Sequence, residues 1–115
     1  MAVIAVDPKS NGTWLTFEWL AVTEADTFAP IYLNHNVSDI LIEAEGTWGG
    51  ATLTLSGWVI TEAAVFAMVD PAGATISMTA DASSPVRDAF PHMRPLHSGG
   101  TSETIDVRIH MKVVK

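Results

Sequence analysis

The stretch that decides the fold is Thr104–Val113, TIDVRIHMKV, because apolar and polar residues alternate along it without a break. Its apolar positions are Ile105, Val107, Ile109, Met111 and Val113, and its polar positions are Thr104, Asp106, Arg108, His110 and Lys112. Successive side chains of a β-strand point to opposite faces. The alternation therefore predicts a strand with one face in the core and one in solvent.

The same period of two recurs upstream, and it predicts strands over residues 13–22, 37–48, 51–59, 74–80 and 89–97. The last of these contains Pro91 and Pro95, which have no backbone N–H to donate, so we expect it at a sheet edge or a bulge. Between the second and third, Gly49-Gly50 supplies the positive φ that a tight hairpin turn needs.

Helical segments are few and short in this sequence. Residues 23–29 and 61–66 could each form a single turn, and neither is long enough for a stable amphipathic helix. Short strands separated by Gly- and Pro-containing turns favour an all-β fold, and we expect a single antiparallel β-sandwich over residues 1–115, jelly-roll-like, with about eight strands. Residues 1–12 are either an N-terminal docking arm or the first strand of the domain's own sheet.

Composition excludes several classes of function. The 115 residues include no cysteine, which excludes thiolate catalysis and cysteine-based zinc sites. The formal charge is −7, and a chain this acidic is repelled by the phosphate backbone of nucleic acids. No stretch approaches the roughly 20 apolar residues that span a bilayer, and no secretory signal is visible. We expect a soluble protein that binds neither nucleic acid nor membranes.

The charges are also distributed unevenly. Residues 1–86 hold ten acids and one base, whereas residues 87–115 hold three acids and five bases. The asymmetry is either an ordinary solvated surface or a polar surface that pairs with another subunit.

Side chains capable of catalysis or metal binding do not form a recognisable pattern. The four histidines, His35, His92, His97 and His110, lack the spacing of convergent metal ligands. Glu43 and Glu45 share one face of a strand, roughly 7 Å apart. That separation suits a glycosidase pair, but a solvated outer face explains it more simply. No nucleophile motif is present. We therefore expect no catalytic residue, no metal, no cofactor and no enzymatic activity.

Four tryptophans are many for so small a domain. Trp19 shares a strand face with Leu15 and Phe17 and is predicted to lie in the core. Trp14 and Trp58 fall on the more polar faces of their strands, where core and interface are equally good interpretations.

Three segments in order resemble a pattern found in small virion proteins of tailed bacteriophages: IEAEGTWGGATLTL at residues 42–55, DPAGATISMT at 70–79 and MRPLHSGGT at 93–101. Their order and spacing match over about residues 40–114. Residues 57–60, GWVI, depart from the pattern, in which a polar loop is more common.

The resemblance implies a β-sandwich that belongs to the virion. Among the roles it implies, we favour a capsid decoration or cement protein that binds across subunits of the major capsid protein and stabilises the head. The alternatives are a head-fibre, head–tail or tail component, or a carbohydrate-binding module that uses exposed tryptophans. The protein would be made in the cytoplasm of the host bacterium and lie on the capsid exterior, as a homo-oligomer, dimer or trimer.

The residues expected at the interface lie in the N-terminal arm, at turns and on polar strand faces: Val3, Ile4, Trp14, Trp48, Gly49, Gly50, Trp58, Arg87 and Arg94.

Overall fold

A computed structural model describes residues 3–4, 7–11, 14–33 and 36–114, the first two ranges by their backbone only. The described chain consists almost entirely of antiparallel strands, with one 3₁₀ turn, η1 (Glu62–Ala64). The predicted all-β sandwich is confirmed.

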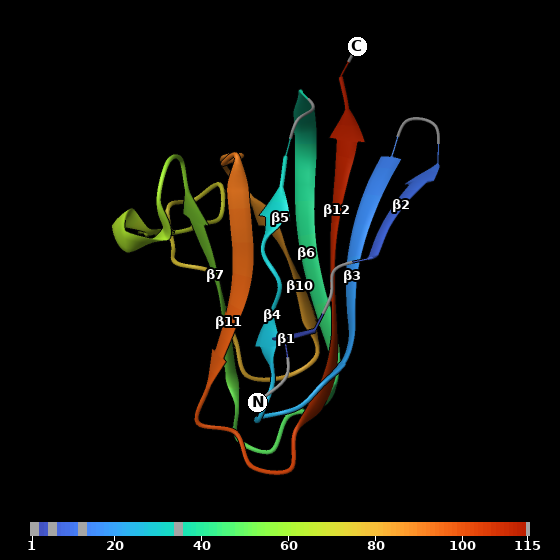
Figure 1. The fold of residues 1–115 in the computed structure, drawn as a ribbon, viewed down its shortest axis with the longest axis vertical. Coiled ribbons are helices and arrows are strands. Elements are labelled where there is room, and N and C mark those ends of the chain that lie inside the picture. Colours follow the sequence, from blue (N-terminus) through green and yellow to red (C-terminus); the bar gives the residue numbers. More distant parts are fainter. Residues whose placement is uncertain (1–2, 5–6, 12–13, 34–35, 115) are drawn as a thin grey trace.

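Two sheets make up the sandwich (Figure 1). The first sheet has the order β10 (Ala82–Val86), β6 (Val37–Thr47), β12 (Thr104–Val113), β3 (Trp14–Val22) and β2 (Asp7–Asn11). The second sheet has the order β5 (Ile31–Tyr32), β11 (His92–Ser98), β7 (Thr52–Trp58) and β8 (Phe66–Ala67), and β9 (Ser77–Met78) also pairs with β7. A small parallel pair joins β1 (Val3–Ile4) to β4 (Thr27–Phe28).

The strand pairing is nested. β3 pairs with β12, β5 with β11, β6 with β10 and β7 with β8, each time antiparallel. The first strand of this series thus pairs with the last, and each following strand pairs with the one that precedes the last, toward the middle of the chain. This is the arrangement of a long antiparallel ribbon folded over on itself, which is the topology of a jelly roll.

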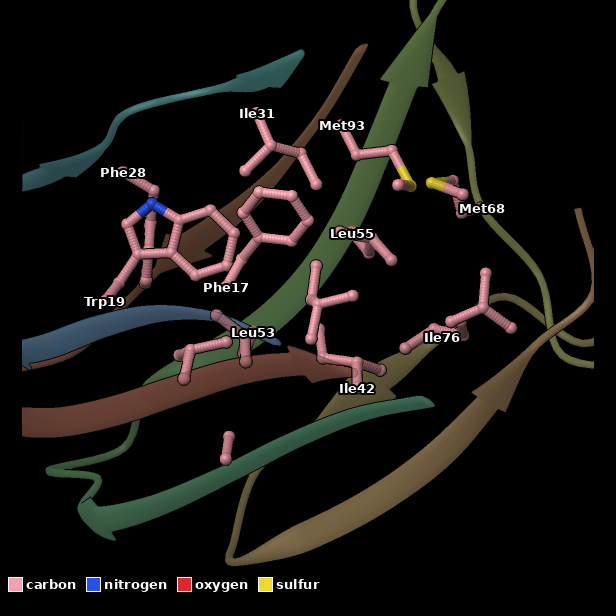
Figure 2. Close-up of a cluster of buried hydrophobic side chains, with 14 of the residues drawn as sticks. Phe17, Trp19, Phe28, Ile31, Ile42, Leu53, Leu55, Met68, Ile76 and Met93 are labelled. Carbon is pink, nitrogen blue, oxygen red and sulfur yellow. The ribbon is translucent and has the colours of Figure 1, made fainter. Parts of the chain in front are cut away.

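The core lies between the two sheets, where the apolar faces of their strands meet (Figure 2). Trp19, Ile42, Leu53, Met93 and Ile109 are almost completely shielded from solvent. The predicted burial of Trp19 is confirmed, and its indole N–H donates to the carbonyl of Ala29 at 2.9 Å. All four alternate apolar residues from Ile105 to Met111 are buried, as the period of two predicts.

The strongest sequence patterns gave the best strand boundaries. β12 has the predicted limits, and β3, β6 and β7 each fall within one residue of theirs. Residues 61–66 contain the predicted helical turn, η1. Residues 23–29 instead form a hydrogen-bonded turn, in which the Asp26 N–H donates to the Thr23 carbonyl. Residues 74–80 were predicted as one strand, but only Ser77–Met78 pairs in a sheet.

The predicted hairpin at Gly49-Gly50 is wrong. Both glycines have positive φ, +55° and +85°, as expected. However, β6 belongs to the first sheet and β7 to the second, so this connection crosses between the sheets at a corner of the sandwich. The connection from β11 to β12 crosses beside it, and the Thr101 N–H donates to the Gly49 carbonyl at 2.9 Å. Turn residues set the local backbone, but they do not determine which sheet the next strand joins.

The proline-containing strand, β11, lies between β5 and β7. β5 pairs only with His92 and Met93 of β11. At Pro95, β11 therefore has a partner strand on one side only, which is β7. This position tolerates a residue that cannot donate a backbone hydrogen bond.

The described part of the N-terminal segment pairs within its own domain. Val3–Ile4 lies parallel to Thr27–Phe28, and Asp7–Asn11 lies antiparallel to β3. Residues 1–2, 5–6 and 12 of the predicted arm lie outside the described residues.

Candidate interaction surface

The most unusual surface feature is residues 59–67, VITEAAVFA, here called the apolar loop. All nine residues are exposed, and seven are apolar. Ile60 is 89% exposed, and Val59, Val65 and Phe66 are each about half exposed. The loop includes η1 and projects from the side of the second sheet beside β7 (Figure 1). Exposed apolar residues gathered in this way make the loop a candidate contact surface.

Several polar contacts hold the apolar loop in place. Thr61 caps η1, with its side-chain oxygen accepting from the Ala63 N–H and its carbonyl accepting from the Ala64 N–H. Glu62 forms an ion pair with Arg94 of β11. The loop is therefore anchored to the sheet through a side chain on the neighbouring strand.

An aromatic ladder lies at the base of the loop, on the outer face of the second sheet. Trp58 stacks on His92 with ring centroids 5.4 Å apart and planes within 6°. His92 in turn contacts Tyr32 at 5.0 Å, and the Arg94 guanidinium lies 5.9 Å from the Trp58 ring centroid. Trp58 is only 5% exposed, although it lies outside the core cluster. Its ring thus supports the surface and has no open face to offer a sugar.

A second aromatic pair supports the other end of the loop. Phe66 stacks on Phe90 with centroids 5.6 Å apart and planes within 7°. Gly57 makes this possible, because a Cβ at that position would lie 2.6 Å from the Phe90 ring. A shallow hollow of about 170 Å³ lies beside the pair, next to the ion pair between Arg87 and Asp88 at 3.1 Å.

The outer face of the first sheet is, by contrast, a network of polar pairs. Arg108 donates to Glu18 at 2.8 Å and to Glu45 at 3.2 Å. The hydrogen bond from Arg108 to Glu18 raises the pKa of the guanidinium. The imidazole of His110 contacts Glu43 at 2.8 Å and Thr16 at 2.9 Å. Glu43 and Glu45 therefore face outward together, as predicted, and each is paired with a cationic or imidazole group on β12.

A buried polar pair joins the two sheets near their crossing connections. The Nδ1 atom of His97 lies 2.8 Å from Glu103, and its Nε2 atom lies 2.6 Å from the Asp26 carbonyl. A carbonyl only accepts, so Nε2 carries a proton and donates it. Glu103 is 1% exposed. The pair could not be predicted from the sequence, because its two members are six residues apart across a Ser-Gly-Gly turn, a spacing with no recognisable motif.

Acidic side chains also accept hydrogen bonds near the two connections that cross between the sheets. Asp81 accepts from the Trp48 indole at 2.8 Å and from the Gly46 N–H at 3.0 Å, and these bonds lower the pKa of its carboxyl group. Glu24 accepts from the Ser102 N–H at 2.8 Å, and hydrogen bonds from backbone N–H groups lower its pKa as well.

The structure brings together only some of the residues predicted at an interface. Trp58 and Arg94 meet at the base of the apolar loop, and Arg87 lies beside Phe66 and Phe90. Trp48, Gly49 and Gly50 lie at a corner of the sandwich, and Trp14, 42% exposed, lies on the first sheet. Val3 and Ile4 pair with β4. The loop was not predicted from the sequence, because a short apolar run is typical of a buried strand.

Within the described ranges, no three His, Asp or Glu side chains converge so as to hold a metal ion. No helix in these ranges has the length and apolar character needed to cross a bilayer.

Comparison with known proteins gives no family for this chain: no protein-family description matches its sequence, and no curated protein matches it as a relative.

Proposed function

We propose that this protein is a non-catalytic structural component of a tailed-bacteriophage virion, a decoration protein that binds across subunits of the major capsid protein and stabilises the head. The three segments that resemble phage virion proteins support the assignment. They fall on the two crossing corners, the turn before β9 and strands β6, β7 and β11.

The observation that carries the proposal is a contrast between two kinds of surface. Two imidazoles of the described chain are engaged in internal pairs, His110 with Glu43 and His97 with Glu103. Exposed apolar side chains are gathered on the apolar loop, which is anchored by Arg94. An exposed apolar surface of this kind favours a protein that works by making contacts.

A jelly roll also suits the mechanical demands of this role. Its loops and outer faces are held by a packed core and by corner hydrogen bonds, so they lose little freedom on binding. A decoration protein is present in many copies, and modest single contacts are then strengthened by multivalency. A fold without disulfides forms readily in the reducing bacterial cytoplasm.

The proposal is tested on purified phage particles from the source virus. We expect quantitative mass spectrometry to find the chain in stoichiometric ratio to the major capsid protein, and cryo-electron microscopy to place it on the outer surface of the head. Its absence from particles would contradict the proposal. Density at the tail or at a fibre would replace the decoration role by the corresponding alternative.

A further inference from the structure

We propose that the apolar loop is a self-association surface, occupied by the same loop of a second copy of this chain in a two-fold symmetric dimer. The proposal names a second copy of the chain as the partner of the same loop that supports the proposed function, and it stands whether or not the protein belongs to a virion. Three observations support it: the exposed side chains of residues 59–67, the contacts that hold them in place, and the charges around them.

The loop is already in a binding-ready conformation. Trp58 is buried beneath it, Glu62 is tied to Arg94, and Phe66 is stacked on Phe90. A segment that is fixed before binding pays little ordering entropy when a partner covers it. The exposed side chains are therefore held outward by the fold.

The charge of the surroundings selects the occupant. The chain carries a net charge of −7, so two copies repel each other through most of their surfaces. At the loop and beside it, however, two acids are paired with bases: Glu62 with Arg94 and Asp88 with Arg87. A basic partner would gain more on the acidic surfaces elsewhere, whereas a second acidic chain is repelled less at a patch such as this one, where these charges are paired.

The area is also of the right order. The exposed fractions of Val59, Ile60, Val65 and Phe66 correspond to between two and three fully exposed large side chains, or on the order of 400 Å². The exposed Ala63, Ala64 and Ala67 add to this. In a two-fold contact both copies bury this patch, which gives about 1,000 Å² of buried surface in total, the lower end for a specific interface. The dimer is therefore expected to be weak, with a dissociation constant in the micromolar range.

The test is analytical ultracentrifugation of the full chain from about 1 µM to about 500 µM. The wild-type protein is expected to pass from monomer to dimer over this range. Ile60→Ser should weaken the dimer by about tenfold or more. The matched control is Leu20→Ser, because Leu20 is 46% exposed on the first sheet and should leave dimerisation unchanged. Circular dichroism checks that each variant is folded.

A second measurement locates the contact directly. Since the chain has no cysteine, Ile60→Cys and Leu20→Cys each introduce one attachment point for a nitroxide spin label. As a control, each spin-labelled variant is also measured after it has been mixed at a low ratio with unlabelled protein. Pulsed electron resonance should give one short, narrow inter-label distance at position 60 and a longer distance at position 20. A wild-type chain that stays monomeric, or a dimer unaffected by Ile60→Ser, would overturn the proposal.

Discussion

The carboxyl group of Asp81 is exposed, yet it accepts hydrogen bonds from both the Trp48 indole and the Gly46 backbone. These bonds lower the pKa of the Asp81 carboxyl group. The ionised carboxylate therefore stabilises the folded state at pH values above the pKa that the same group has in the unfolded chain. This contribution is lost as the pH falls through the lower folded pKa. We predict that Asp81→Asn removes part of the acid-induced loss of stability below about pH 4, where aspartate ordinarily titrates.

Urea unfolding followed by tryptophan fluorescence, from about pH 2 to about pH 7, measures this effect. Asp39→Asn is the matched control, since Asp39 is an exposed carboxylate whose side chain contacts Ser38 only at 3.5 Å. If the free energy of unfolding changed with pH equally in the wild type and in Asp81→Asn, the hydrogen bonds of Asp81 with Trp48 and Gly46 would not contribute to stability.

Glu103 illustrates a different residue-scale effect, because it is buried against His97. Removing one member of a buried polar pair leaves the other without its partner, and we predict that Glu103→Ala destabilises the fold by about 3 kcal/mol. Chemical denaturation measures this value. In the double variant His97→Ala/Glu103→Ala, the loss should be clearly smaller than the sum of the two single losses. Additive losses would show that the two side chains do not interact.

At the scale of elements, the two crossing connections depend on the close approach of backbone to backbone. A Cβ at Gly49 would overlap the carbonyl of Thr101, and Gly49 has φ of +55°. Gly50 also has positive φ, +85°, but its nearest neighbour would be 3.8 Å away. We predict that Gly49→Ala costs about 3 kcal/mol or more, and Gly50→Ala only about 1 kcal/mol. Thermal and urea unfolding compare the two, and equal losses would contradict the proposed contact between the corners.

The apolar loop depends on Arg94 for its attachment. Arg94→Met keeps much of the side chain's length but removes the ion pair with Glu62, so the loop should open more often. We predict faster cleavage within residues 59–67 by a protease of broad specificity, with the global unfolding midpoint little changed. Arg87→Met is the control, because Arg87 lies beside the loop but its ion pair is with Asp88, outside residues 59–67. Equal cleavage of both variants would show that Arg94 does not restrain the loop.

Elements with strict alternation could be predicted from the sequence, and β12 is the clearest because its ten residues follow the period without exception. The location of apolar residues outside that period, in the core or at the surface, could not be predicted in this way. Val65 and Phe66 belong to a short apolar run that resembles a core strand, yet they lie in solvent. Trp14 and Trp58 both fall on polar strand faces, and only the packing of His92 and Arg94 distinguishes the covered ring from the exposed one.

For the whole molecule, the sequence predicted a jelly-roll-like sandwich but not how the corners connect its sheets. Strand faces are local properties, whereas the partner of β6 is chosen by contacts with β12, some 60 residues later. The candidate interaction surface could be predicted only in part for the same reason: Trp58 and Arg94 lie far apart in the chain and meet through the register of β7 with β11.

The same long-range pairing has a kinetic consequence. A fold whose contacts join distant segments must close large loops before these contacts compensate for the lost entropy. We predict that refolding takes milliseconds to seconds, as in other β-sandwiches, and stopped-flow tryptophan fluorescence measures it. A microsecond refolding phase carrying the full amplitude would contradict this prediction.

The position of β12 between β6 and β3 has a further consequence for biosynthesis. A nascent chain whose first hundred residues have emerged from the ribosome still lacks the strand on which both neighbours depend. The native first sheet can therefore close only after translation of β12 and its release from the exit tunnel, and until then the apolar faces of β3 and β6 are open to chaperones.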